Sequence, residues 1–170
     1  MNSRFLGIPI ILFTVAIGAA SRRGSSQSED KLAIQRLFAD FSAAIRAKDL
    51  NKVMSAYSRD EHAIYYDAFT PRQYLGYSAY RKDYEAFFKQ FPGPASSKVT
   101  DLHIGVSGTI AYAYGIDSWS ISGADRKPQP MVFRFSELLR KENGRWVVFH
   151  EHVSFPVDPA TSKVDFMSKP

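Results

Sequence analysis

Asp67 is the first residue of this 170-residue chain whose position could support chemistry. It ends the strand-like stretch HAIYYD, and Tyr65, Phe69 and Tyr74 lie near it in the sequence. A carboxyl group among aromatic rings loses hydration, which raises its pKa and suits it to abstract a proton near neutral pH. In the alternative, Asp67 is an exposed loop residue whose carboxylate accepts hydrogen bonds from nearby backbone N–H groups.

A second set of polar residues lies in the last two predicted strands, which Asn143-Gly144 joins as a tight hairpin turn. A two-residue turn pairs Ser136 with Glu151 and Arg134 with Val153. One face of the hairpin then carries Val132, Arg134, Ser136, Leu138, Val147, Phe149, Glu151 and Val153. On that face Arg134 lies diagonally from Glu151, either as a structural ion pair or as a group that binds a ligand carboxylate.

The same pairing turns His150 and His152 to the opposite face of the hairpin. The other residues of that face are Phe133, Phe135, Glu137 and Trp146. Two histidines at i and i+2 can reach one metal ion, with Glu137 as a third ligand. We prefer an aromatic interface with hydrogen-bonded histidines, and we predict no metal site. A β-bulge would instead turn His152 into a pocket as an acid–base group.

The elements that must position these residues follow from the periodicity of apolar side chains. These recur every three or four positions over residues 29–48, in a short helix after Asp49, and over residues 77–91. From residue 97 the period becomes two, which predicts strands over residues 97–106, 109–121, 131–140 and 145–155. Helices followed by an antiparallel meander indicate an α+β fold with helices on one face of the sheet.

The first 20 residues have the features of a secretory signal peptide, with Arg4 and then an uncharged run over residues 5–20. We therefore expect a secreted or periplasmic protein without stable membrane anchoring after cleavage, and a flexible linker over residues 21–28. The absence of Cys excludes disulfides and thiol chemistry. The net charge of +5 comes from scattered basic residues, so no nucleic-acid groove is expected. The sequence contains no Gly-rich phosphate loop, so no cofactor is predicted.

Three stretches of the sequence resemble the nuclear transport factor 2-like (NTF2-like) superfamily, and within it the SnoaL-like and ketosteroid-isomerase-like branch. They are AKDLNKVMSAYSRD, YYDAFTPRQYLGYSAYRKDYEAFF and FRFSELLRKENGRWVVFHEHVSFP, all within residues 29–156. The resemblance implies an NTF2-like cone, in which a curved antiparallel sheet wraps around three N-terminal helices and leaves a conical pocket. It also implies a homodimer through the outer sheet face, and it turns the face with Arg134 and Glu151 toward the pocket.

By this resemblance, Asp67 takes the position of the general base of the steroid isomerases. The positions of their two oxyanion donors fall on Phe41, which cannot donate a hydrogen bond, and on Ser136, which is only weakly acidic. Losing one oxyanion donor costs about 2.7–4 kcal/mol in other enzymes. Steroid isomerase activity is therefore not expected.

We therefore expect the domain over residues 29–156 to bind a small, mostly apolar molecule. The residues predicted to line its pocket are Tyr65, Phe69, Tyr74, Arg134, Ser136, Phe149 and Glu151. The first alternative is an isomerase, dehydratase or cyclase that uses Asp67 or His152 as general base. The second is a dimeric interaction module without a ligand. Residues 157–170 are predicted to form an irregular tail.

Overall fold

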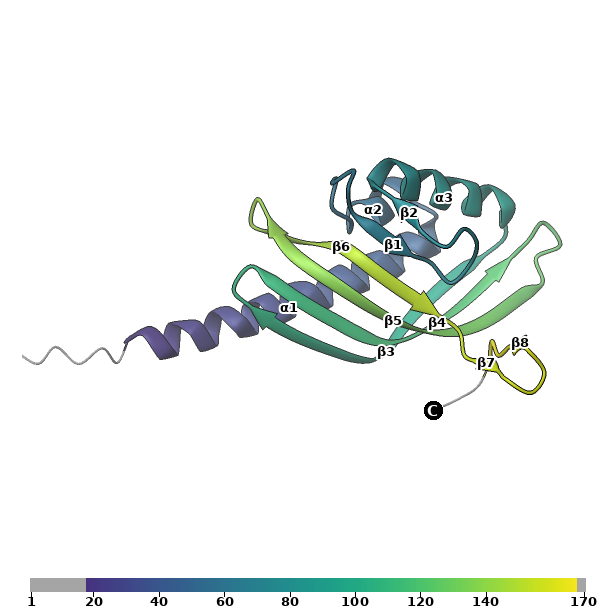
Figure 1. Cartoon of the computed structure of the whole chain (residues 1–170). Helices are drawn as coiled ribbons and strands as arrows, with labels where there is room; N and C mark the ends of the chain where they lie inside the picture. Colours follow the sequence, from purple (N-terminus) through teal and green to yellow (C-terminus); the bar gives the residue numbers. More distant parts are fainter. Residues whose placement is uncertain (1–17, 168–170) are drawn as a thin grey trace, which may run out of the picture.

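The computed structural model describes residues 18–167 and packs helices against a curved sheet (Figure 1). The helices are α1 (Gly18–Ala47), α2 (Leu50–Met54) and α3 (Tyr77–Gln90). The strands are β1 (Ile64–Tyr66), β2 (Tyr74–Leu75), β3 (Ala95–Ser107), β4 (Ile110–Ser122), β5 (Pro128–Glu142), β6 (Arg145–Ser154), β7 (Val157–Asp158) and β8 (Lys163–Val164). The predicted α+β cone is confirmed, with the helices preceding the long strands.

The main sheet has the order β2-β1-β6-β5-β4-β3, and it is mixed rather than purely antiparallel as expected. Strand β1 runs parallel to β6, which is possible because α3 and four strands separate the two in the chain. Strand β2 pairs antiparallel with β1 and extends this edge of the sheet. Two residues are too few to show a period, which explains why β2 was not predicted.

Within residues 157–167 the chain forms two short strands, whereas we expected an irregular tail over residues 157–170. Its strands β7 and β8 form a small separate sheet. The backbone N–H of Val132 donates to the carbonyl of Phe166 at 2.8 Å, and the Phe166 ring packs on Phe155 with 4.8 Å between centroids. These contacts fix the segment against β5 and the end of β6.

Two irregularities bend the sheet. The pairing of β3 with β4 shifts between Thr100 and His103, where Asp101 has a positive φ of 51°. The pairing of β5 with β6 shifts between Leu138 and Leu139, which leaves Phe149 of β6 as the extra residue of a bulge. Bulges of this kind increase local twist and curvature, so the sheet can close around the helices.

Helix α1 supplies much of the core through one face. Ile34, Phe38, Ser42 and Ile45 are buried on that face, and the helix packs mainly against β3. The helix begins at Gly18, so residues 21–28 are helical rather than a flexible linker. Adding residues to an existing helix is far less costly than nucleating one, which explains how a segment of weak helix formers continues the ladder.

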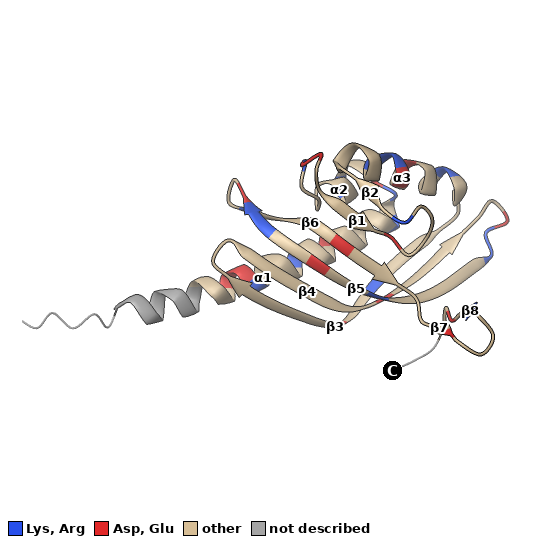
Figure 2. Ribbon diagram, viewed as in Figure 1, with Lys and Arg blue, Asp and Glu red and all other residues tan. Residues whose placement is uncertain are grey.

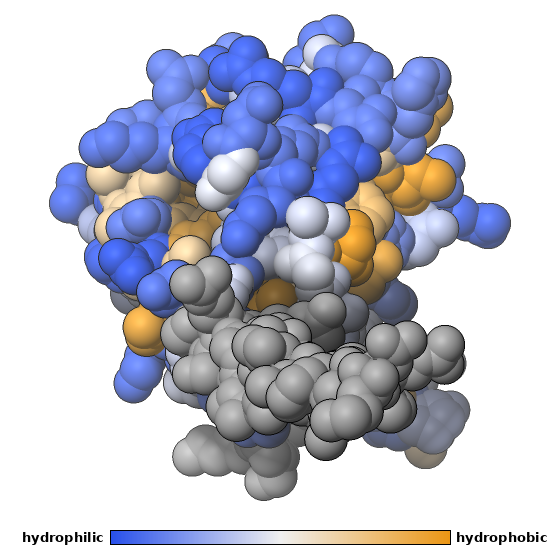
Figure 3. Space-filling model, turned by 90° about the vertical axis from the view of Figure 1, so that its left-hand side faces the viewer, coloured by the Kyte–Doolittle hydropathy of each residue, from blue (hydrophilic) through white to orange (hydrophobic). Residues whose placement is uncertain are grey.

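The predicted signal peptide lies largely outside the described residues, because residues 1–17 are not among them. No helix in the described part of the chain combines the length and apolar character needed to cross a bilayer. Figure 3 views the end from which α1 projects, where hydrophilic side chains dominate and apolar patches are small.

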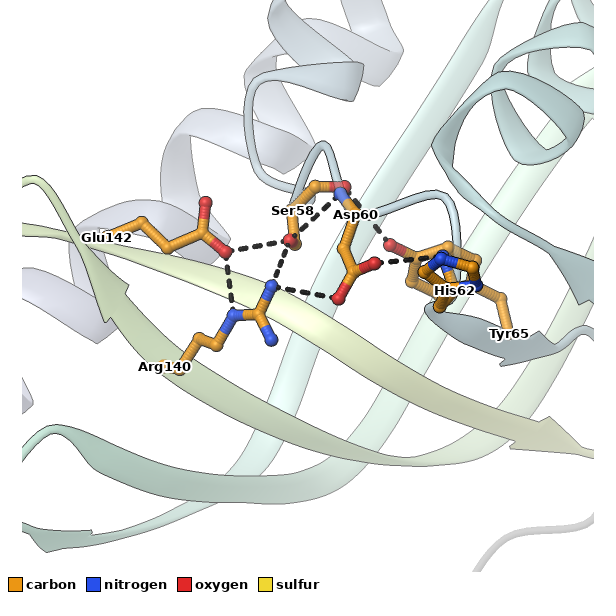
Figure 4. A network of polar contacts seen from close by, with 6 residues as sticks. All are labelled: Ser58, Asp60, His62, Tyr65, Arg140 and Glu142. Atoms are coloured by element: carbon orange, nitrogen blue, oxygen red, sulfur yellow. Dashed lines mark hydrogen bonds and ion pairs between the residues drawn. The ribbon is translucent and has the colours of Figure 1, made fainter.

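A polar network ties the loop after α2 to the β5–β6 hairpin (Figure 4). Arg140 donates to Glu142 at 2.7 Å and to Asp60 at 3.2 Å, and it also donates to the hydroxyl of Ser58 at 2.9 Å. Ser58 in turn donates to Glu142 at 2.7 Å. The backbone N–H of His62, followed by Arg140, lowers the pKa of Asp60. Partial burial alone would raise the pKa of Glu142, but the hydrogen bonds from Ser58 and Arg140 lower it overall. The network therefore holds the chain before β1 in place.

Candidate functional site

A cavity of about 70 Å³ lies between the helices and the sheet. Aromatic rings form most of its wall, namely Phe38, Phe41, Phe69, Tyr80, Tyr84, Phe87, Trp119, Phe133 and Phe135. A second, larger hollow shares Asp67, Phe69 and Phe87 with it and extends to the β4–β5 hairpin and Phe166.

Every charged residue in the described wall of this cavity is acidic. The five are Asp67, Asp83, Asp117, Glu137 and Glu151, and no Lys, Arg or His is among the described lining residues. Figure 2 shows acidic segments in the middle of β5 and β6, within the sheet rather than at its rim. The site therefore combines an apolar, aromatic wall with five carboxyl groups.

Glu137 and Glu151 form a carboxyl pair at the centre of the sheet. They are direct cross-strand partners on β5 and β6, and both are at least nine-tenths buried. Burial raises the pKa of Glu151 to about 7. Burial, followed by the negative charge of Glu151, raises the pKa of Glu137 well above its usual range. The two side chains share a hydrogen bond, in which the protonated carboxyl of Glu137 donates and the carboxylate of Glu151 accepts.

Tyrosine hydroxyls support Glu151 from the helical side. Tyr57 donates to one of its oxygens at 2.9 Å, and Tyr80 donates to the other. The hydroxyl of Tyr84 lies 3.2 Å from that of Tyr57. Burial raises the pKa of all three tyrosines well above their usual range, so they act as neutral donors. Apart from the proton that it shares with Glu151, Glu137 has no such support: its Oε2 is buried, and no N–H or hydroxyl group of the described residues donates to it.

Asp67 lies just after β1 and lines both the cavity and the hollow outside it. Its carboxylate accepts a hydrogen bond from the backbone N–H of Ala68 at 2.6 Å. Burial raises the pKa of Asp67 to about 6, and the nearby charge of Asp83 acts in the same direction. A group with this pKa can accept or give a proton near neutral pH.

The two remaining acidic residues are held by neighbouring groups. Asp117 of β4 accepts from the indole N–H of Trp119 at 2.7 Å, from the hydroxyl of Ser97 and from the backbone N–H of Lys98. Asp83 of α3 accepts from the hydroxyl of Tyr74 at 2.5 Å. Burial raises the pKa of both.

The structure brings three of the predicted site residues together in the cavity: Asp67, Phe69 and Glu151. Tyr65 and Tyr74 lie behind this wall. Tyr65 is fully buried and stacks on Tyr80 with 4.5 Å between ring centroids, and Tyr74 contacts Tyr80 and holds Asp83. Both therefore support the lining without belonging to it.

Four predicted residues lie elsewhere. Arg134, Ser136 and His152 line a separate shallow hollow that also contains Tyr114 and Ser154, not the aromatic cavity. Arg134 donates to the hydroxyl of Ser154 at 3.1 Å, so the predicted ion pair with Glu151 is wrong. Phe149 is the bulged residue and packs against the guanidinium of Arg140, 5.2 Å from the ring centroid.

The bulge at Phe149 explains these differences. One extra residue in β6 shifts the pairing, so Glu151 lies opposite Glu137 rather than Ser136. Phe133, Phe135 and Glu137 therefore line the cavity instead of the outer face, while Arg134 and Ser136 point away from it. Trp146 is also buried rather than on an interface, and its indole N–H donates to Asp30 at 3.0 Å.

The histidines lie outside the cavity, on the face of Arg134 and Ser136 rather than on the predicted face of Phe133 and Phe135. His150 lies 2.8 Å from the carbonyl oxygen of Ile64, and both histidine rings pack edge-on against Tyr66. No group of three or more metal-ligating side chains occurs in the described part of the chain. His152 consequently does not reach the cavity as a general base.

Two acidic residues of the site, Asp83 and Asp117, were not predicted from the sequence, and Glu137 was expected on the outer face as a possible metal ligand rather than in the cavity. A signal for Asp117 exists, because it alternates with small and apolar residues at period two in β4. The inward-facing set is Ala111, Ala113, Gly115, Asp117, Trp119 and Ile121. A lone carboxylate in such a row indicates a polar group that faces the core.

Comparisons with known proteins agree with this architecture. A family model described as a SnoaL-like domain matches residues 34–158. An NTF2-like protein of unknown function from Pseudomonas putida KT2440 is 27% identical, with a TM-score of 0.73 over 86% of this chain and 98% of that chain. An NTF2-like superfamily protein from Salmonella enterica is 18% identical, with a TM-score of 0.69 over 78% and 94%.

A third solved structure, from Novosphingobium aromaticivorans, is provisionally named a scytalone dehydratase. It is 14% identical, with a TM-score of 0.67 over 83% of this chain and 89% of that chain. The search among curated proteins found no match. Since the family model spans most of the chain, including all five acidic residues of the cavity, the chain belongs to the SnoaL-like domain family of the NTF2-like superfamily.

Proposed function

We propose that the chain binds a small, mostly apolar molecule in the aromatic cavity. The observation that carries this proposal is the cavity itself, which is open, walled by aromatic rings and furnished with a few buried polar groups. Pockets of this composition are the usual sites of small-molecule binding. Binding would follow export from the cytoplasm, which the sequence of residues 1–20 suggests.

Filling the cavity tests this proposal. Val153 lines it from β6, so Val153→Trp would occupy the space that a ligand needs. Val164→Trp is the matched control, because Val164 is exposed on β8. The probe is N-phenyl-1-naphthylamine, a fluorescent apolar compound that is uncharged at neutral pH. We expect at least ten-fold weaker binding by Val153→Trp than by wild type and Val164→Trp. Equal binding by all three proteins would contradict the proposal.

Acid–base catalysis in the same cavity is the second candidate function. It is favoured by Asp67, whose pKa near 6 is suited to proton abstraction, and by the neutral Glu137, which can donate a hydrogen bond to a developing negative charge. An isomerase or dehydratase reaction would use these two groups as base and donor. The test is turnover of a carbonyl substrate that Asp67→Asn abolishes and that rises with pH around 6 in the wild type.

A homodimer through the outer sheet face completes the proposal. Ile110, Tyr112, Tyr114 and Leu138 are each more than 40% exposed and lie on neighbouring strands β4 and β5. We call these four residues the outer patch. A second copy covering this patch would remove large apolar side chains from water. The partner surface therefore uses the outer patch and not Phe133, Phe135 and Trp146, which face inward.

A further inference from the structure

The charge of the cavity wall is one-sided, and this limits what can bind there. The wall holds five carboxyl groups, three on strands β4, β5 and β6, one on α3 and one in the loop after β1, and no basic side chain among the described lining residues offsets them. An anionic ligand would meet only negative or neutral groups. A neutral ligand would not offset the negative charge of the buried pair Glu137 and Glu151.

Glu137 provides an independent sign that a group is missing from this site. Only 8% of its surface is exposed, and its Oε2 has no hydrogen-bond partner in the described part of the chain. Buried polar atoms are almost always satisfied in folded proteins. The atom itself is closed off from water, but its carboxyl group lines the cavity, so a small rotation of the Glu137 side chain would bring Oε2 to a donor on a ligand.

The aromatic wall favours the same kind of ligand. The lining of the cavity places the rings of Trp119, Phe135 and Tyr84 in the same wall as the carboxyl groups. The faces of aromatic rings carry partial negative charge and attract cations, most strongly where water is excluded. Rings and carboxyl groups together therefore form a site that is selective for positive charge on an apolar body.

We infer that the ligand of this cavity carries a protonated amine, whose N–H groups donate to Glu137 and Glu151 while its apolar part packs on the aromatic wall. This inference rests on the proposed function and specifies its ligand class. Amine binding would supply the donor that Oε2 of Glu137 lacks. It would also stabilise the ionised form of both carboxyl groups, so that protons leave the pair when the amine enters.

Other titratable groups around the pair act in the same sense. Asp67, in the loop after β1, and Asp117 of β4 contribute negative charge. Burial keeps Tyr57, Tyr80 and Tyr84 neutral between pH 5 and pH 8. Asp83 lines the wall from α3. Amine affinity should therefore rise between about pH 5 and pH 8, as Asp67 and Glu151 lose their protons near 6 and 7.

The experiment compares three probes of similar shape by calorimetry at pH 8: 2-phenylethylamine, 2-phenylethanol and phenylacetate. We expect the amine to bind at least ten-fold more tightly than the alcohol and phenylacetate to bind most weakly. Measured in two buffers of different ionisation enthalpy at pH 6.5, amine binding should release protons, whereas alcohol binding should not.

Glu137→Gln should reduce the preference for the amine over the alcohol to below three-fold, and a cooperative thermal unfolding transition like that of the wild type would show that the variant remains folded. Glu85→Gln is the matched control, since Glu85 is an exposed carboxylate of α3, and it should behave as wild type. Equal or better binding of the alcohol by the wild type would overturn the inference while leaving the proposed function intact. No binding of any probe by the folded chain would contradict both.

Discussion

Replacing Asp67 by Asn should stabilise the protein above pH 6. Burial raises the pKa of Asp67 from 3.8 to about 6, which means that the folded state holds this proton more tightly than the unfolded state. The wild type therefore loses stability as the pH rises from about 4 to 6, and the loss stays constant at higher pH. Asparagine has the same shape and does not ionise, so Asp67→Asn escapes this loss.

The shift corresponds to about 3 kcal/mol at most, since one pKa unit is worth about 1.4 kcal/mol. Asp67 is partly exposed at the mouth of the cavity, and water screens part of this effect, so we expect a gain of about 1–2 kcal/mol. Such a gain is common where function requires a buried charge.

The assay is urea unfolding of wild type and Asp67→Asn at pH 4, 5, 6, 7 and 8. The difference in free energy of unfolding should be close to zero at pH 4, increase toward pH 6 and then level off. Glu85→Gln serves as control, because Lys89 lowers the pKa of this exposed carboxyl and the variant should gain no stability with rising pH. A difference for Asp67→Asn that does not change with pH would refute the reasoning, because it would mean that Asp67 is not desolvated.

Two further predictions concern the frame of the site. Arg140→Met should lower the Tm by about 2–4 °C at pH 7, because it removes the donors that join Asp60, Glu142 and Ser58. The pKa values of Asp60 and Glu142 are lowered in the folded state, so the stability that they contribute is lost as the pH falls. The Tm difference between wild type and Arg140→Met should therefore be smaller at pH 3 than at pH 7, and an equal difference at both pH values would exclude an ionic role for Arg140. Tyr112→Glu should convert a dimer to a monomer in sedimentation equilibrium, since it places charge in the outer patch, and an unchanged mass would exclude this face as the interface.

The sequence predicts much of the frame because its signals are local. Asn143 and Gly144 have the positive φ values of 50° and 79° that a tight hairpin turn requires, and the turn forms where predicted. The apolar period of residues 77–91 likewise matches α3 to within one residue. These features depend on neighbours in the chain, which a single sequence displays.

The lining of the cavity depends on a feature that no local signal marks. The bulge at Phe149 reverses the inward and outward alternation along β6, so Trp146 and Glu151 both face inward although their spacing is odd. The period-two rule alone favours the observed face of β5, since Met131, Phe133, Phe135 and Leu139 are far more apolar than Arg134, Ser136 and Arg140. Pairing counted from the turn without the bulge gave the opposite face.

The most direct test of the central claim, that the aromatic cavity is the ligand site, is a 1H–15N NMR titration with 2-phenylethylamine. The chain has two tryptophans, and only Trp119 lines the cavity, where its indole N–H donates to Asp117. Trp146 lies apart from the cavity wall, with its indole N–H donating to Asp30. The Trp119 indole signal should shift on titration, whereas the Trp146 signal should not. Equal shifts of both signals, or shifts confined to Tyr112 and Tyr114 of the outer patch, would contradict the central claim.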